Sequence, residues 1–188
     1  MKTKKQSRIL FIALGLVIAL PALSFGLSQL FPATTTREIT INVEPDQVWE
    51  VLSDLESFLQ WHPAITSFSG EAEVGDTVAF TNKEGGSSIS FTPTILAAEP
   101  ARELCWLGHV AFPGLMDGNH SFVLEPAGES TKVTQSESFT GILGMFAPLF
   151  MDLGASFEAS NKALANFVEC LKSSDFSRSP HWPPSGNY

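Results

Sequence analysis

A succession of short β-type runs, followed by one long helical pattern, constrains the fold of this chain more than any other feature. The runs lie between Ile65 and Gly141 and are separated by turns such as GEAEVGD and FPGLMDG, which are rich in glycine, proline and acidic residues. Because consecutive strands joined by short turns pair antiparallel, this segment predicts an antiparallel meander. The predicted strands are 65–69, 77–81, 88–97, 103–110, 119–124 and 132–139.

One strand and two short helices are predicted before the meander. Apolar residues alternate with polar ones over 37–43, which predicts a seventh, half-buried strand. Pro45 then opens a helix with a single apolar stripe. A second short helix, over 54–60, ends before Pro63, because proline disfavours helical backbone at the residue before it.

The closing segment, 146–171, has large apolar residues along one side of a helix. Its middle, between Phe157 and Leu164, is thin and polar, with only Ser160 and Asn161 on the stripe and Ala163 beside it. Gly154 and Ala155 are further small residues on or beside the stripe, so the space inside the sheet is expected to be incompletely filled along this helix. A sheet that curves around such a helix leaves an elongated, mostly apolar cavity. The element order therefore predicts an α+β fold in which a seven-stranded curved antiparallel sheet wraps one long C-terminal helix.

The N-terminal segment, 1–31, is separate from this domain. From Ile9 to Phe31 it has no charged side chain, and at about 1.5 Å per residue it just spans a hydrocarbon core of about 30 Å. The alternatives are an uncleaved signal anchor and a cleaved signal peptide with a break at Pro21 and small residues at Ala22 and Ser24. The apolar run continues past Pro21, which favours the anchor.

Both alternatives keep the basic N-terminus in the cytoplasm and place the domain on the periplasmic or extracellular side. With cleavage the domain would be secreted instead. Residues 32–36 read as a linker, short enough to hold the domain near the bilayer, and 37–173 as the domain. The tail, 174–188, has prolines and no period, and is expected to be disordered.

Charge is divided unevenly along the chain. Four of the 11 basic residues precede Arg37, and no acidic residue does, so the chain from Arg37 onward has seven basic and 20 acidic residues and a net charge of −13. A nucleic-acid-binding domain needs a basic face, so that class is excluded. The same charge argues against electrostatic docking of the domain on anionic lipid, and the acidic surface is the one hint of a protein-binding role.

The sequence contains no recognisable metal or cofactor motif. The four histidines lack the short spacings of metal sites, no glycine-rich phosphate loop joins a strand to a helix, and no cofactor is expected. Those histidines are His62, His109, His120 and His181. Cys105 and Cys170 are compatible with a disulfide or with two buried free thiols.

From Arg37 to Leu171 the chain resembles the START-like (SRPBCC) superfamily, in its polyketide cyclase/dehydrase and lipid transport branch. The resemblance is carried by ITINVEPDQVWEVLSDLESFLQWHPAI (39–65), ARELCWLG (101–108), DGNHSFVLEP (117–126), TKVTQSESFTGILG (131–144) and FEASNKALANFVECL (157–171). It implies the helix-grip fold and a hydrophobic ligand or polyketide-like substrate. A common family form has asparagine where His62 stands. Because the fold hosts transporters, receptors, cyclases and co-chaperones, function depends on the site.

Trp61 and His62 stand where the second short helix ends. One interpretation is that Trp61 caps the core while His62 is solvated, since tryptophan is usually largely buried. The other is that Trp61 lines the mouth of the cavity and meets the ligand, and the resemblance favours a place near that mouth.

Polar residues also alternate with apolar ones on two of the predicted strands. His120 and Phe122 share one face of their strand, and Gln135, Glu137 and Phe139 share one face of theirs. If both faces point inward, His120 and Glu137 could anchor a polar group of a ligand or act as an acid/base pair. The alternative is that one or both faces point to solvent, or that these polar groups only satisfy one another.

The leading hypothesis is therefore a membrane-tethered module that binds a lipid or another hydrophobic small molecule between sheet and helix. The rival is a polyketide cyclase or dehydratase using His120 and Glu137. The candidate ligand-contacting residues are Trp61, Trp106, His120, Phe122, Gln135, Glu137, Phe139, Phe146 and Phe157.

Overall fold

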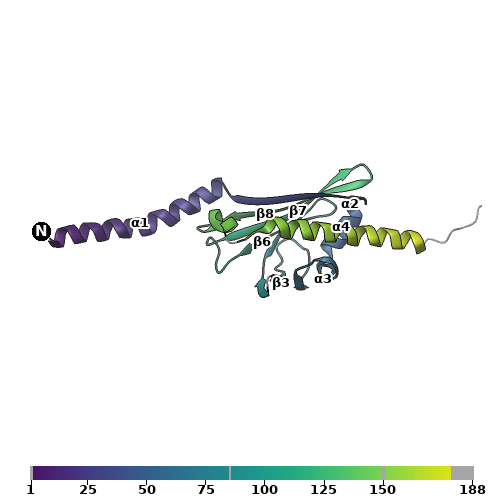
Figure 1. The fold of residues 1–188 in the computed structure, drawn as a ribbon, viewed down its shortest axis with the longest axis horizontal. Helices are drawn as coiled ribbons and strands as arrows, with labels where there is room; N and C mark the ends of the chain where they lie inside the picture. Colours follow the sequence, from purple (N-terminus) through teal and green to yellow (C-terminus); the bar gives the residue numbers. More distant parts are fainter. Residues whose placement is uncertain (1, 85, 150, 179–188) are drawn as a thin grey trace, which may run out of the picture.

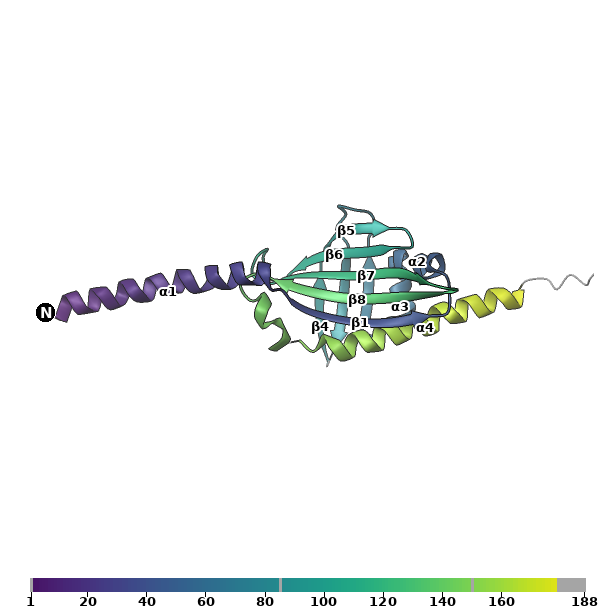
Figure 2. The same ribbon diagram turned by 90° about the horizontal axis from the view of Figure 1, so that it is seen from above.

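The computed structural model describes residues 2–84, 86–149 and 151–178 and places two antiparallel sheets against each other. A five-stranded sheet has the order β1-β8-β7-β6-β5, and a three-stranded sheet has the order β2-β3-β4. The smaller sheet crosses beneath the long strands of the larger one (Figure 2). The strands are β1 (Ala33–Ile41), β2 (Ile65–Ser69), β3 (Ala79–Glu84), β4 (Ser87–Phe91), β5 (Thr94–Glu99), β6 (Glu103–His109), β7 (Asp117–Ala127) and β8 (Ser130–Thr140).

The helices lie at the ends and along one side of this pair of sheets. They are α1 (Lys2–Leu30), α2 (Pro45–Ser53), α3 (Phe58–Trp61) and α4 (Leu153–Arg178), with the 3₁₀ turns η1 (Leu55–Ser57) and η2 (Gly144–Leu149). α1 projects from one end of the domain, and α4 runs beside β1 toward the opposite end (Figures 1 and 2). The α+β fold with antiparallel sheets and a long C-terminal helix agrees with the sequence prediction.

The strand count differs from the predicted seven strands in a single sheet. The run predicted over 88–97 is two strands, β4 and β5, separated at Pro93. Proline has no backbone N–H to donate to a ladder, so the pairing is interrupted there. The chain leaves the small sheet at this point and enters the large one, which produces two sheets rather than one.

The N-terminal region also differs in detail. Residues 33–36, predicted as part of a linker, are the first residues of β1, because they pair with Ser136–Phe139 of β8. α1 continues through Pro21, and the most apolar stretch within Arg8–Leu30 has a mean hydropathy of 2.5 and is not buried against the domain. That segment is long and apolar enough to cross a membrane, although a signal sequence meets the same criteria.

The long C-terminal helix begins later than predicted. Residues predicted from 146 onward as its first turn form η2 instead, and α4 starts at Leu153. The Asp152 carboxylate accepts a hydrogen bond from the Gly154 N–H at 3.2 Å, as an N-capping residue does. Residues 174–178, predicted as disordered, are the last residues of α4, while 179–188 lie outside the described residues.

The larger of two apolar clusters joins the concave face of the large sheet to α2, α3, α4 and the small sheet, and the smaller one consists of Met116, Phe139 and Ala147. Phe58 and Phe122 are its largest fully buried side chains. The Phe58 ring lies 5.0 Å from that of Phe68 and 6.5 Å from those of Trp106 and Phe122. These aromatic contacts fill the α3 end of the core and leave the other end less filled.

Candidate functional site

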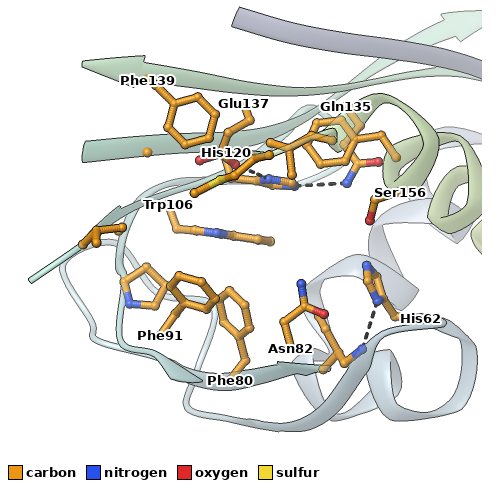
Figure 3. A pocket seen from close by; sticks show the side chains of 18 of the residues that line it. His62, Phe80, Asn82, Phe91, Trp106, His120, Gln135, Glu137, Phe139 and Ser156 are labelled. Atoms are coloured by element: carbon orange, nitrogen blue, oxygen red, sulfur yellow. Dashed lines mark hydrogen bonds and ion pairs between the residues drawn. The ribbon is translucent and has the colours of Figure 1, made fainter. Parts of the chain in front are cut away.

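A cavity of about 160 Å³ lies between the large sheet, the small sheet and the first turns of α4. Its wall is mainly aromatic and aliphatic, with a few polar side chains directed inward (Figure 3). The residues that line it are Phe58, His62, Ile65, Phe80, Asn82, Phe91, Pro93, Trp106, Gly108, His109, Val110, Met116, Gly118, His120, Phe122, Gln135, Glu137, Phe139, Met151, Leu153, Ser156 and Phe157.

The cavity lies beside the part of the helix that contains the predicted small residues Gly154 and Ala155, and not beside its thin middle at 160–163. Ser160 is 2% exposed, and its hydroxyl donates to the Gln135 Oε1 atom at 3.1 Å. Asn161 is also buried there, and Ala163 packs against the core. The protein's own side chains therefore fill this region, and the space opens one to two turns earlier, beside Leu153 and Ser156.

The register of three strands sets the central row of the site. Trp106 of β6 is opposite His120 of β7, and His120 is opposite Glu137 of β8. Directly opposed residues on one sheet face lie within side-chain contact, so the three form a continuous row. The Trp106 and His120 rings stack at 4.7 Å with an interplanar angle of 8°, and the rings of His120 and Phe157 form a T-shaped pair with centroids 5.3 Å apart.

A chain of hydrogen bonds fixes the His120 imidazole (Figure 3). Its Nδ1 lies 2.7 Å from Glu137 Oε2, and its Nε2 lies 3.2 Å from Gln135 Nε2. Because the amide nitrogen of Gln135 can only donate, the Nε2 atom of His120 is the acceptor. The proton of the His120 ring is therefore on Nδ1, which donates to the Glu137 carboxylate. The oxygen of the same Gln135 amide accepts from the Ser160 hydroxyl. Both ring nitrogens of His120 are thus bonded to protein groups, Glu137 and Gln135.

Gly118 makes room for the Glu137 carboxylate. A Cβ atom at this position would overlap Glu137 Oε1 and come within 3.4 Å of the Phe139 ring. The backbone of Gly118 is not in a left-handed conformation, so space rather than φ explains the glycine. The sequence analysis did not identify this requirement, because it depends on a neighbour in the adjacent strand.

His62 and Asn82 form the opposite wall of the cavity (Figure 3). The Nδ1 atom of His62 accepts from the N–H groups of Ala64 and Ile65, both at 3.2 Å. Burial, and to a lesser extent the repulsion between His62 and His120 when both are protonated, lowers the pKa of His62 to about 4, so its imidazole is neutral at pH 7. The buried Oδ1 of Asn82 has no hydrogen-bond partner among the described residues.

The two cysteines are both free, and they differ in environment. Cys105 is buried and its thiol donates to Asn119 Oδ1 at 3.0 Å, whereas Cys170 is exposed on α4. Burial, together with the charges of Glu103 and Glu137, raises the pKa of Cys105 to about 11. Cys105 is therefore a protonated, unreactive thiol at neutral pH.

Seven of the nine candidate ligand-contacting residues line the cavity, and two do not. Trp61 is 7% exposed and packs on Phe58, with ring centroids 4.6 Å apart, so it belongs to the core. Phe146 lies on η2 and is 44% exposed. It lies outside the cavity because α4 starts seven residues later, so the helical spacing used to place Phe146 does not apply there. The seven are Trp106, His120, Phe122, Gln135, Glu137, Phe139 and Phe157.

The sequence analysis missed several lining residues. His62 was expected to be solvated, but α3 is only one turn long, and with Trp61 turned into the core the next residue faces the cavity. Asn82, Phe80 and Phe91 come from the small sheet, which the sequence did not separate from the large one. The alternation of Phe80 and Asn82 on β3 was the available signal.

The concave antiparallel sheet closed by a long C-terminal helix, with an apolar cavity inside, defines the helix-grip class of START-like proteins. The chain belongs to the polyketide cyclase / dehydrase and lipid transport family, whose model matches residues 32–169. A search of curated protein sequences finds no significant match.

Several solved structures share the fold. The Zhui aromatase/cyclase from Streptomyces sp. R1128 has a TM-score of 0.61 and 16% identity, over 73% of this chain and 94% of that one. A START superfamily protein from Mycobacterium smegmatis has a TM-score of 0.58 and 17% identity, over 73% and 98%. Ara h 8.0201 has a TM-score of 0.54 and 19% identity, over 74% and 99%. At these identities the similarity establishes the fold.

Proposed function

We propose that this chain is a membrane-anchored binding protein for a small hydrophobic molecule that carries one polar group. The observation that supports this function best is the cavity of about 160 Å³ with an aromatic wall and a few inward polar side chains. Apolar cavities of about 150 Å³ in other proteins hold benzene, so the space fits one ring or a short aliphatic segment. The remainder of a longer ligand would extend out of the cavity.

The energetics are sufficient for binding. Burial of about 200 Å² of apolar ligand surface at about 25 cal/mol per Å² contributes on the order of 5 kcal/mol before ordering costs. A hydrogen bond to a charged group contributes about 1.5–3 kcal/mol more. Glu137 is the acceptor we assign to a ligand hydroxyl, and the unpartnered Asn82 oxygen is a second acceptor on the opposite wall.

A cyclase or dehydratase activity is the second candidate. It is favoured by the His120–Glu137 pair, whose side chains are 12% and 14% exposed and 2.7 Å apart, well within the reach that proton transfer needs. However, a general base needs a lone pair directed at the substrate, and Gln135 occupies the Nε2 atom of His120. Catalysis would require Gln135 to turn away, and for this reason binding is our first choice.

The proposal places the domain on the periplasmic or extracellular side of a membrane crossed by α1. The apolar segment Arg8–Leu30 supports the anchor, and the basic residues before it support the orientation. If a peptidase removed α1, the domain would be secreted with the same cavity.

Quenching of tryptophan fluorescence by 4-bromophenol, a ring with one hydroxyl, tests the binding function. The full chain is purified in a non-ionic detergent and titrated. Bromine quenches a nearby indole, and Trp106 lines the cavity, so we expect saturable quenching that is absent from the Trp106→Phe variant. Native mass spectrometry of the same preparation would identify a co-purifying ligand.

A pair of glycine substitutions tests the polar contact. Gly118→Ala displaces the Glu137 carboxylate and should weaken 4-bromophenol binding by roughly tenfold, as expected for one lost hydrogen bond to a charged group. Gly26→Ala is the matched control, because a Cβ there meets nothing within 4 Å. Equal, non-saturable quenching in all variants would exclude binding in this cavity.

A further inference from the structure

Two uncharged loops surround the base of α1. The β6–β7 loop contains VAFPGLM (110–116), and the β8–η2 segment contains GILGMFAPL (141–149), so neither has a charged side chain. In a domain with a net charge of −13 from Arg37 onward, these two segments give the base of α1 an uncharged surround.

Hydrogen bonds join the two loops to each other and to α1. Ile142 N–H donates to Gly114 O at 2.9 Å, and Leu143 N–H donates to Leu115 O at 2.7 Å. The Ser24 hydroxyl of α1 donates to Ile142 O at 2.7 Å. Ser28, which is fully buried, accepts from the Gly141 N–H at 2.9 Å. The loops and the last two turns of α1 therefore form one fixed unit.

Large apolar side chains project from this unit into solvent. Phe112 is 55% exposed on the first loop, and Leu149 is 76% exposed at the end of the second. The other exposed apolar residues nearby are Val110, Leu143, Met145 and Phe146, with Leu30 and Phe31 at the end of α1. Exposed apolar patches rimmed by polar surface mark protein or membrane contacts. We call this set the apolar collar.

The length of α1 indicates what covers the collar. The 15 residues from Ile9 to Leu23 are free of the domain apart from Pro21, and they rise about 22 Å at about 1.5 Å per residue. A hydrocarbon core is about 30 Å thick, so these residues alone do not span it. The remaining 8 Å or so must come from Ser24–Ser28, the turns around which the loops pack.

We propose that the apolar collar rests on the hydrocarbon boundary of the bilayer that α1 crosses. The polar atoms at this depth are compatible with that position, because Ser24 and Ser28 both use their hydroxyls within the protein. The contact is apolar rather than electrostatic, in keeping with the acidic domain. A bilayer is therefore the partner that fits this surface.

This position has a consequence for the cavity, and this part of the inference rests on the proposed binding function. Val110 and Met116 of the first loop and Met151, just after the second, line the cavity. The collar thus brings one side of the cavity to the membrane surface. A hydrophobic ligand would pass between bilayer and cavity along Val110 and Met151 without crossing water.

Spin-label depth measurements on the full chain in phosphatidylcholine vesicles test the docking. Nitroxides are attached at Phe112→Cys and Leu149→Cys in a Cys170→Ser background, where the remaining Cys105 is buried. We expect both labels to be several-fold more accessible to oxygen than to a water-soluble nickel chelate. The matched control is a label on native Cys170, which is exposed in the last third of α4 and should show the reverse. α4 runs away from the base of α1 (Figure 2).

The outcomes separate this inference from the proposed function. Labels at positions 112 and 149 that are more accessible to the nickel chelate than to oxygen would overturn the membrane docking. Low accessibility to both oxygen and the nickel chelate would also overturn it, and would indicate a protein partner or a second copy of the chain. Failure of 4-bromophenol to bind would remove the binding function and leave the label result standing. The Phe112→Asp, Leu149→Asp double variant should raise the nickel accessibility of a label at Met145→Cys at least threefold, without changing 4-bromophenol affinity.

Discussion

The neutral His62 makes the stability of the domain depend on pH. Its pKa is about 4 in the folded protein and about 6.5 in an unfolded chain. Between these values the unfolded state binds more protons, so stability is fully present above about pH 6.5 and is lost as pH falls toward 4. From pH 7.5 to pH 4.5 the loss is about 2.5 kcal/mol, which corresponds to roughly 5–10 °C in Tm for a chain of this size.

The hydrogen bonds of His62 supply a second reason for the loss. Its Nδ1 accepts from the N–H groups of Ala64 and Ile65, and a proton on this atom would face two donors. The His62→Asn variant replaces the acceptor with an amide oxygen, which commonly accepts from the backbone two residues on and does not titrate. The variant therefore preserves the turn and removes the proton uptake.

Thermal unfolding of the full chain in non-ionic detergent, followed by near-ultraviolet circular dichroism at pH 7.5 and 4.5, measures the difference. Other groups titrate in both proteins, so the informative quantity is the difference between the two pH-dependent changes in Tm. We expect the decrease in Tm on acidification to be roughly 5–10 °C larger for the wild type than for His62→Asn. Equal decreases would show that His62 is not a neutral, buried acceptor, and the reasoning would fail.

Two further predictions concern the thiols and the base of α1. A thiol reagent should modify only one cysteine per native chain, Cys170, and should reach Cys105 only after denaturation; modification of both in the folded state would contradict the burial of Cys105. The Ser28→Ala substitution should leave the buried Gly141 N–H without its acceptor, which costs about 1–3 kcal/mol of local stability. Hydrogen exchange in the segment after β8 should therefore rise by roughly 5- to 100-fold. Unchanged exchange there would show that α1 does not hold this segment.

Local pattern was sufficient for the fold class and for much of the site. Alternation predicted that Gln135 and Glu137 share one face of their strand and that His120 and Phe122 share one face of theirs, because side chains in a strand alternate whatever the partner strand is. The structure decided that both faces point into the cavity. A continuous pattern could not show where one sheet ends, so β4 and β5 were read as one strand. The break depends on Pro93 and on which sheet each half joins.

The sequence predicted only part of the position of the cavity. Periodicity located the thin middle of the helix, but whether that region is empty depends on a side chain from another strand. Gln135, from β8, fills it by bonding to Ser160. The same limit applies to Trp61 and His62, because which of two neighbouring residues faces the core is decided by the packing of Phe58 and Phe68 around a single helical turn.

The sequence by itself determined the α+β class, the family, the long apolar helix and the alternating faces that carry the polar residues of the site. These features depend on hydrophobic periodicity and composition, which are local. Only the tertiary structure decided the 2.7 Å contact of His120 with Glu137, the burial that keeps His62 neutral, and the bonds of Ser24 and Ser28 to the domain. Distances and solvation depend on residues far apart in the chain, and a linear pattern contains no information on how they meet.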